Sequence, residues 1–281
     1  MRLIRFGERG NERPGLWKNG NIVDLKQIFP SIPDIGEAFF RDGWHEKVAR
    51  VSDPGRKIDV RIACPVHRPS KIICLGKNYA EHAKEGGFEN PETPVIFCKT
   101  PNTLNGPFDP IVLPKSSGQV DWEVELALII GKEGKGVRKK DALSYIAGFS
   151  VFNDVSGREA QFSDSQWFRG KSFDTFSPVG PYIVTLDEIG GIEDIHNLRL
   201  TAAVDDQIMQ DGNTRHMIFD IPTILENISE DMTLVPGDII ATGTPEGVGF
   251  FRDPPIVLKS GNVVECRIEK IGTLKNEVVG N

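Results

Sequence analysis

Three carboxylates alternate with apolar residues in SGQVDWEVELALIIG, residues 117–131. Asp121, Glu123 and Glu125 are spaced two residues apart, so in a β-strand their side chains would share one face. Partial burial of that face would force like charges together, which is unfavourable unless a cation or protons compensate. The solvated outer face of an antiparallel strand is the alternative interpretation, and the spacing alone leaves both open.

Two neighbouring features favour a metal site. The carboxylates run directly into LALIIG (126–131), an unbroken apolar run typical of a strand covered on both sides. A second apolar strand, in FSVFNDVSGR (149–158), ends at Asp154. Carboxylates that converge at strand ends form an oxygen-rich site, which suits Mg²⁺, Mn²⁺ or Ca²⁺. The chain has no H-x-x-x-H or C-x-x-C pattern that would favour zinc.

Two further segments carry residues of catalytic type. In NYAEHAKE (78–85), His82 and Glu85 stand three positions apart, so on a helix they would be neighbours on one face. Lys171 lies in FRGKSFDTFSPVGP (168–181), whose glycines, phenylalanines and prolines indicate a compact, largely covered loop. A solvated polar helix and a surface lysine are the alternatives for these residues.

The composition is that of an ordinary globular protein. A chain of 281 residues can bury a full core, as one large domain or a large domain with a small appendage. The net charge of −7 does not favour a nucleic-acid partner. The N-terminus lacks the features of a signal peptide, and no run approaches the roughly 18 apolar residues of a membrane span. We therefore expect a cytoplasmic protein without a membrane partner, whose four scattered cysteines are buried thiols.

Short β-type segments between Gly- and Pro-rich turns predict an α+β, β-rich fold of packed or rolled sheets. The first 65 residues read as a unit of their own, with short strands and a helix-like spacing over 34–51. Other helices are expected at 78–87, with Asn78 as the N-cap and Gly86 as the stop, at 158–162, and at 216–229 with Pro222 in a first turn.

The motifs, taken in order, resemble the fumarylacetoacetate hydrolase (FAH) family. The resemblance begins near residue 70 and runs through LGKNYAEHAKE, PVIFCK, DWEVELALIIG, GFSVFNDVSGREAQ, RGKSFDTFSPVGP, IFDIPTILENIS and GDIIATGTPEGVG. It implies the FAH-type mixed β-sandwich roll, with residues 1–65 as a small N-terminal β domain and 66–281 as the catalytic domain. It also implies a homodimer.

The resemblance then implies roles for individual residues. Glu123, Glu125 and Asp154 match the family's ligands for one divalent cation, Mg²⁺ or Mn²⁺, which Ca²⁺ can replace in crystals. Asp121 lies one pleat outside this group and is expected to support the site, because an octahedral ion keeps waters and does not recruit every nearby carboxylate.

The remaining roles concern the substrate and its chemistry. His82 and Glu85 match a dyad that activates water, carried by a short helix that orders over the substrate. Lys171 matches a lysine that stabilises developing negative charge. The residues that match substrate contacts are Gln161 and Thr244, and further candidates with a structural role as the alternative are Tyr79 and Lys99.

These roles imply a small 2-oxo acid as substrate. Because both His82 and Glu85 are present, we expect hydrolysis of a C–C bond in a 2,4-dioxo acid, either an acylpyruvate or a 2,4-dioxo-3-deoxy sugar acid, to pyruvate and a carboxylic acid. The segment around Lys171 resembles bacterial sugar-acid enzymes that often carry the name ureidoglycolate lyase. Alternatives are that lyase activity, a 2-hydroxymuconate-type isomerase, an oxaloacetate-type decarboxylase and a binding protein without turnover. Loops 103–110 and 162–169, with Trp167 and Arg169, are expected to contact the distal end of the substrate.

Overall fold

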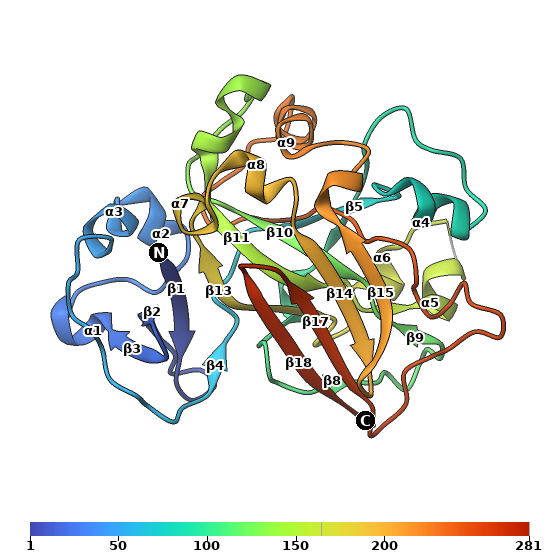
Figure 1. Cartoon of the computed structure of the whole chain (residues 1–281), viewed down its shortest axis with the longest axis horizontal. Coiled ribbons are helices and arrows are strands. Elements are labelled where there is room, and N and C mark those ends of the chain that lie inside the picture. The colour runs from blue at the N-terminus through green and yellow to red at the C-terminus, as the bar shows by residue number, and fades with distance from the viewer. Residues whose placement is uncertain (164, 281) are drawn as a thin grey trace.

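The computed structural model describes residues 1–163 and 165–280. Asp164, which belongs to the loop expected to contact the substrate, and Asn281 lie outside the described residues. Within the described chain, an eleven-stranded sheet and a five-stranded sheet form the body, and a two-stranded ribbon lies beside them (Figure 1). The architecture is therefore β-rich with short helices, as the sequence predicts.

The large sheet runs through nine strands in one continuous order. These are β3 (Asn21–Asp24), β2 (Arg13–Lys18), β1 (Arg2–Phe6), β13 (Ser177–Val184), β11 (Ile146–Asn153), β10 (Val124–Ile130), β16 (Ile239–Ala241), β5 (Ile72–Gly76) and β6 (Val95–Lys99). Two short strands join it at the side, β4 (Ile62–Ala63) on β1 and β7 (Leu104–Asn105) on β13. The antiparallel register of β10 and β11 sets Val124 opposite Asn153, so the acidic start of β10 lies beside Asp154.

The five-stranded sheet packs against one face of the large one (Figure 1). Its order is β15 (Gln207–Asn213), β14 (Arg199–Val204), β17 (Val263–Ile268), β18 (Gly272–Val279) and β8 (Ile111–Val112). Strand β10 is buried along its whole length, and its residues alternate between two cores. Leu126 and Leu128 join the core shared with the five-stranded sheet, whereas Ala127 and Ile129 join the core on the other face. The prediction of a strand covered on both sides is confirmed.

The N-terminal strands continue the large sheet, because Leu3 of β1 pairs with Ile183 of β13. Helices α1 (Leu25–Ile28), α2 (Glu37–Arg41) and α3 (Trp44–Val48) follow them (Figure 1). Phe39 and Phe40 of α2 are buried in the same core as β10 residues. The helix-like spacing over 34–51 thus becomes two short helices, and the division of the chain at residue 65 stays a prediction.

The other helices of the described chain are short, with nine residues at most. They are α4 (Ala80–Glu85), α5 (Arg158–Phe162), α6 (Phe168–Lys171), α7 (Leu186–Ile189), α8 (Ile192–Ile195) and α9 (Ile221–Ser229), with 3₁₀ turns η1 (Pro101–Thr103), η2 (Lys139–Tyr145) and η3 (Thr214–His216). The two-stranded ribbon pairs β9 (Val120–Asp121) with β12 (Ser156–Gly157). No helix of the described chain is long and apolar enough to span a membrane.

Two helix predictions need correction. Tyr79 and not Asn78 takes the N-cap position of α4. The Asn78 side chain is used elsewhere: its oxygen accepts from the Phe219 amide, and its nitrogen donates to the carbonyls of Phe219 and Thr242. Helix α9 begins at Ile221 and not at residue 216, because Asp220 caps it by accepting from the Thr223 amide. The expected stop at Gly86, helix at 158–162 and first-turn position of Pro222 are confirmed.

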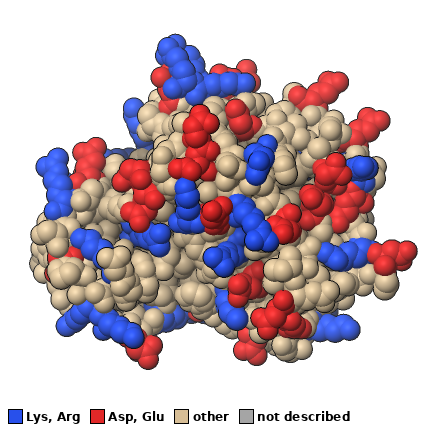
Figure 2. All heavy atoms as spheres, viewed as in Figure 1, with Lys and Arg blue, Asp and Glu red and all other residues tan. Residues whose placement is uncertain are grey.

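Acidic and basic side chains are interspersed on the face shown in Figure 2. A group of buried charged residues inside the fold contrasts with this surface and defines the candidate site.

Candidate active site

The acidic segment is interrupted where a continuous strand was predicted. Strand β9 ends at Asp121 and β10 starts at Val124, so Trp122 and Glu123 lie between two strands. The Asn153 side-chain oxygen accepts from the Glu123 amide at 3.0 Å, and the Glu123 carbonyl accepts from the Asp154 amide at 2.9 Å. These two hydrogen bonds join the residue before β10 to the end of β11, and they hold Glu123 beside Asp154.

Three carboxylates converge at this point. Glu123, Glu125 and Asp154 each offer an oxygen, and these oxygens all lie within 4.8 Å of one another. The three residues are only 5%, 1% and 0% exposed, respectively. The predicted convergence is present, and a buried set of three carboxylates with oxygen donors only fits a divalent cation of the Mg²⁺ or Mn²⁺ type.

Two buried lysines neutralise part of this negative charge. Lys171 Nζ lies 2.8 Å from Glu123 Oε2 and 2.7 Å from Asp154 Oδ2. Lys99 Nζ lies 2.5 Å from the other Asp154 oxygen, and it also donates to the carbonyls of Val155 and Phe176. Asp154 is thus held between two ammonium groups, while Lys171 bridges two of the three carboxylates.

Arg158 belongs to the same group, although sequence reasoning did not select it. Its Nη2 lies 2.6 Å from Glu123 Oε1 and 2.9 Å from Asp121 Oδ2, and its Nη1 donates to Gln161 Oε1 at 3.0 Å. Arg158 is only 2% exposed. The signal that could have found it is its position as the only cation of the motif FSVFNDVSGREAQ (149–161).

The cations act unequally on the two glutamates. Burial alone would raise the pKa of Glu123, but the charges of Lys171 and Arg158 hold that pKa well below its usual range. Burial raises the pKa of Glu125 well above its usual range, and the charges of Asp154 and Glu123 raise it further. The Gly243 amide donates to Glu125 at 2.7 Å, which offsets little of this cost. A divalent cation would supply the positive charge that Glu125 lacks.

Helix α4 places the predicted dyad beside these carboxylates. His82 Nδ1 lies 3.3 Å from Glu85 Oε2, and both Glu85 oxygens accept from the Gly247 amide, at 3.0 and 3.1 Å. Gly247 has a φ of +98°, and a Cβ there would lie 2.2 Å from the Met209 carbonyl oxygen. Glycine is therefore required at the turn that holds Glu85.

One cavity joins most of these groups. Its lining includes the predicted residues His82, Glu123, Glu125, Gln161, Trp167, Lys171 and Thr244. Thr244 Oγ1 donates to the Val124 carbonyl at 2.8 Å and accepts from the Gln210 side chain. The volume is about 30 Å³, close to the space of one water. A substrate therefore requires the surrounding side chains to move.

Other predicted residues lie outside this lining. They are Tyr79, Glu85, Lys99, Asp154 and Arg169. Glu85 contacts His82, which lines the cavity, whereas Lys99 contacts Asp154, whose other oxygen accepts from the lining residue Lys171. Tyr79 is 1% exposed, and its hydroxyl has no partner among the described residues. Burial raises the Tyr79 pKa far above its usual range, so the hydroxyl stays protonated.

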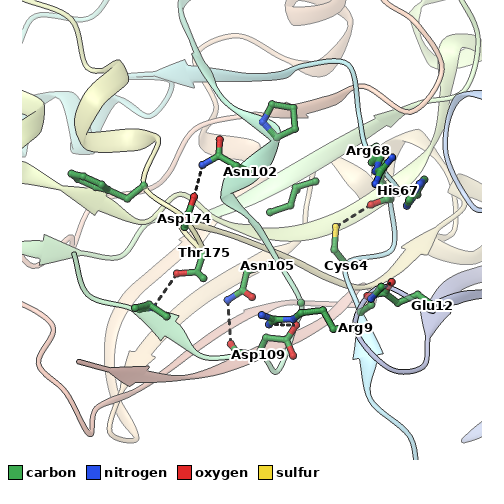
Figure 3. A pocket seen from close by; sticks show the side chains of 18 of the residues that line it. Arg9, Glu12, Cys64, His67, Arg68, Asn102, Asn105, Asp109, Asp174 and Thr175 are labelled. Atoms are coloured by element: carbon green, nitrogen blue, oxygen red, sulfur yellow. Dashed lines mark hydrogen bonds and ion pairs between the residues drawn. The ribbon is translucent and has the colours of Figure 1, made fainter. Parts of the chain in front are cut away.

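A larger cavity of about 1000 Å³ lies between the N-terminal strands and the 101–116 segment (Figure 3). Its charges are largely paired: Arg61 binds Asp109 in a bidentate pair, and Arg5 binds Asp34 in the same way. Figure 3 also shows Asn102 donating to Asp174.

The one thiol in the lining of this larger cavity is unreactive. Burial raises the pKa of Cys64 to about 11, which disfavours the nucleophilic thiolate. Cys64, Cys74 and Cys266 are buried free thiols, as predicted, whereas Cys98 is exposed, because strand β6 turns it outward. The chemistry-bearing groups therefore gather in the smaller cavity.

The chain is similar to several known proteins. Residues 71–279 match the family model described as fumarylacetoacetate (FAA) hydrolase C-terminal. The mitochondrial oxaloacetate tautomerase Fahd2a of Rattus norvegicus is 42% identical over 290 residues, covering 99% of this chain and 92% of that protein.

Solved structures match over the full length of both chains. Maleylpyruvate hydrolase from Sphingobium sp. SYK-6 is 33% identical, with a TM-score of 0.81 and 100% coverage of each chain. The 5-carboxymethyl-2-hydroxymuconate delta-isomerase of Mycobacterium smegmatis is 34% identical, with a TM-score of 0.79 and the same coverage. The β-rich fold with its small N-terminal β region is therefore shared with these proteins.

Proposed function

The chain belongs to the fumarylacetoacetate hydrolase family, and we propose that it is a metal-dependent enzyme that interconverts the keto and enol forms of oxaloacetate. The observation that carries this proposal is the placement of the His82–Glu85 pair beside the triad of Glu123, Glu125 and Asp154. The similarity to the rat oxaloacetate tautomerase, over nearly the whole chain, supports this substrate.

Glu123, Glu125 and Asp154 would hold a divalent cation, which would supply the Lewis-acid chemistry that makes the C3 protons of a 2-oxo acid more acidic. His82 is placed to take one proton from C3, and Glu85 stabilises the imidazolium that results. The imidazolium then returns its proton, directly or through water, to the C2 oxygen to give the enol, so only C–H and O–H bonds change and His82 is regenerated. Lys171 and Arg158, both buried, stabilise the negative charge of the enolate.

Hydrolysis of a C–C bond in a 2,4-dioxo acid is the second candidate. Both Glu85 oxygens accept from the Gly247 amide, which fixes the His–Glu pair. A fixed pair of this kind also suits deprotonation of water, and this favours the hydrolase reaction. Water would then attack C4, and the C3–C4 bond would break to give pyruvate and a carboxylic acid. The full-length likeness to maleylpyruvate hydrolase supports this alternative.

One assay panel separates these reactions. The purified protein is incubated with Mg²⁺ or Mn²⁺, each with an EDTA control, and with oxaloacetate, acylpyruvates or 2,4-dioxo-3-deoxy sugar acids. We expect EDTA-sensitive acceleration of the ultraviolet change that accompanies oxaloacetate enol–keto exchange, without release of pyruvate. Pyruvate release from the dioxo acids would establish the hydrolase, and release from oxaloacetate the decarboxylase. Absence of any metal-dependent change would reject both candidates.

The predicted homodimer and cytoplasmic location belong to the same proposal. Light scattering on the purified 31.1 kDa chain would give about twice that mass for a dimer. Fractionation of the producing cells tests the location.

A further inference from the structure

The active-site cavity contains a cation that none of its carboxylates engages. Lys171 and Arg158 line the cavity, and both form ion pairs with Glu123. Lys77 lines the same cavity, but its ammonium has no ion pair or hydrogen bond to any described residue. A free cation in a cavity that must hold an anionic substrate is available to bind that substrate.

An aromatic ring and not an anion holds the Lys77 ammonium. Nζ lies 4.0 Å from the centroid of the Phe88 ring, a cation–π contact at the exit of α4. Phe88 is 37% exposed and contacts the ring of Phe251, so the ammonium lies at the mouth of the cavity. Glu123 and Glu125 of the triad line the same cavity, so a 2-oxo acid held there would lie within the space that Lys77 also borders.

The backbone fixes this lysine in an unfavourable conformation. Lys77 has a φ of +58°, in the left-handed region that disfavours side chains with a Cβ. Neighbours on both sides hold it there: a Cβ at Gly76 would lie 2.5 Å from the Trp167 ring, and the Asn78 amide binds two carbonyls. Strained residues of this kind persist where the surroundings impose them, commonly at ligand sites.

Six apolar side chains line the same cavity as Lys77: Leu75, Phe88, Phe97, Phe162, Trp167 and Phe251. Gln161 and Thr244 also line it, but two such side chains offer few partners to the several hydroxyl groups of a sugar acid, and burying those groups unpaired is unfavourable. A single carboxylate that reaches Lys77 would instead form a charge-assisted hydrogen bond.

We infer that Lys77 binds the distal carboxylate of the substrate and that the site therefore selects 2-oxo dicarboxylic acids over 2-oxo monocarboxylic acids of equal length. The inference rests on the proposed function in one respect: it takes a 2-oxo acid bound at the triad as the ligand. It goes beyond that function in naming the residue and the group that set specificity.

Two ligands with the same four-carbon chain test this inference. Oxaloacetate has a carboxylate where 2-oxobutanoate has a methyl group, so their affinities differ by that group alone. Dissociation constants are measured by fluorescence titration of the Mn²⁺-loaded protein, for the unmodified chain and for Lys77→Met, Lys77→Arg and Lys84→Met. Lys84 is the matched control, because it lies on α4 with its side chain 80% exposed and outside the cavity lining.

We expect Lys77→Met to weaken oxaloacetate binding about 10- to 100-fold, as for a lost hydrogen bond to a charged group, while 2-oxobutanoate binding changes less than about twofold. Lys77→Arg should retain most of the preference for oxaloacetate, and Lys84→Met should bind both ligands as the unmodified chain does. Equal weakening of both ligands by Lys77→Met, unchanged oxaloacetate binding, or no preference in the unmodified chain would overturn the inference. If the preference depends on Lys77 but oxaloacetate is not tautomerised, the proposed reaction fails and the inference stands.

Discussion

Arg158 links Asp121 to Glu123: its Nη2 lies 2.9 Å from Asp121 Oδ2 and 2.6 Å from Glu123 Oε1. Asp121 also accepts from the amides of Gly249 and Phe250, at 2.8 and 2.9 Å. The carboxylate outside the triad therefore fastens the 249–250 turn to the arginine that orients Glu123. Its contact with Arg158 is one that a supporting role would require, and that role stays a prediction.

Asp121→Asn should weaken the contacts of residue 121 with Arg158 and with the 249–250 turn without creating a cavity in the core. The amide keeps the shape but loses the negative charge that faces buried Arg158, and its nitrogen cannot accept hydrogen bonds. We expect a loss of about 1–3 kcal/mol of unfolding free energy and a lower kcat with a smaller change in KM. Urea unfolding and steady-state kinetics measure the two effects.

Asp211→Asn is the control for Asp121→Asn, since Asp211 pairs with Arg199 on the exposed surface. Its stability and kinetics should match those of the unmodified chain. If Asp121→Asn behaves like this control, Asp121 does not orient Arg158.

Local patterns predicted the strands and the convergence of carboxylates, whereas the choice of Glu123, Glu125 and Asp154 came from the resemblance to the FAH family. The apolar run after Glu125 indicates a buried strand, and Asp154 ends the next one, so their approach needs only the pairing of consecutive strands. The break at Trp122 and Glu123 depends instead on the Asn153 side chain, 30 residues away. A period of two residues carries no information on such a contact.

Two other features could not be predicted from the sequence, because they depend on contacts between residues that lie far apart in the chain. Asn78 has the type and place of an N-cap, but its side-chain oxygen accepts from the Phe219 amide and so does not cap α4. Lys99 lies in a strand where a charged side chain usually faces water, yet it is 2% exposed because Asp154 lies opposite it. Long-range partners decide both cases.

Glu125→Gln should remove the metal site while leaving the fold intact. The substitution keeps the size of the side chain but removes a carboxylate that burial and its acidic neighbours already disfavour. We expect Mn²⁺ affinity to fall by at least about tenfold and activity to fall with it, while the metal-free protein unfolds no more easily than the unmodified chain. Calorimetric titration with Mn²⁺ and thermal unfolding in EDTA give these results. Full metal occupancy with normal activity would exclude Glu125 as a ligand.

Glu85→Gln should lower turnover by about 10²–10⁴, the usual scale for a general base that has lost its partner. Metal binding should be unchanged, because Glu85 contacts His82 and the Gly247 amide and none of the triad. Glu81→Gln is the matched control on the same helix, since the Glu81 side chain is 66% exposed. Steady-state rates and Mn²⁺ titrations of both variants distinguish the roles. Equal rates in the two variants would show that the dyad takes no part in proton transfer.

Asp109 should contribute stability that disappears in acid. Burial alone would raise its pKa, but the bidentate pair with Arg61 holds that pKa below its usual range. A carboxyl whose pKa is lowered on folding stabilises the protein above its unfolded pKa and loses this effect as the pH falls through the folded value. Urea unfolding from about pH 5 downward should therefore show a shallower decline for Asp109→Asn. The same slope in both proteins would contradict the assignment.

Lys171→Met should lower kcat more than it changes KM. Lys171 bridges Glu123 and Asp154 and lines the cavity, so its ammonium would border a substrate bound at the triad. An interaction that strengthens in the transition state affects turnover, whereas one formed equally with bound substrate affects KM. Methionine keeps most of the apolar stem but removes the ammonium, including its contact with the Phe97 ring. Steady-state kinetics at saturating Mn²⁺ measure the effects on kcat and KM separately. A Mn²⁺ titration of the same variant shows whether metal affinity has changed. Normal metal affinity and normal kcat with a raised KM would contradict this role. Lys171 would then bind the substrate and the transition state equally, and its ammonium would not specifically stabilise the charge that forms during proton transfer.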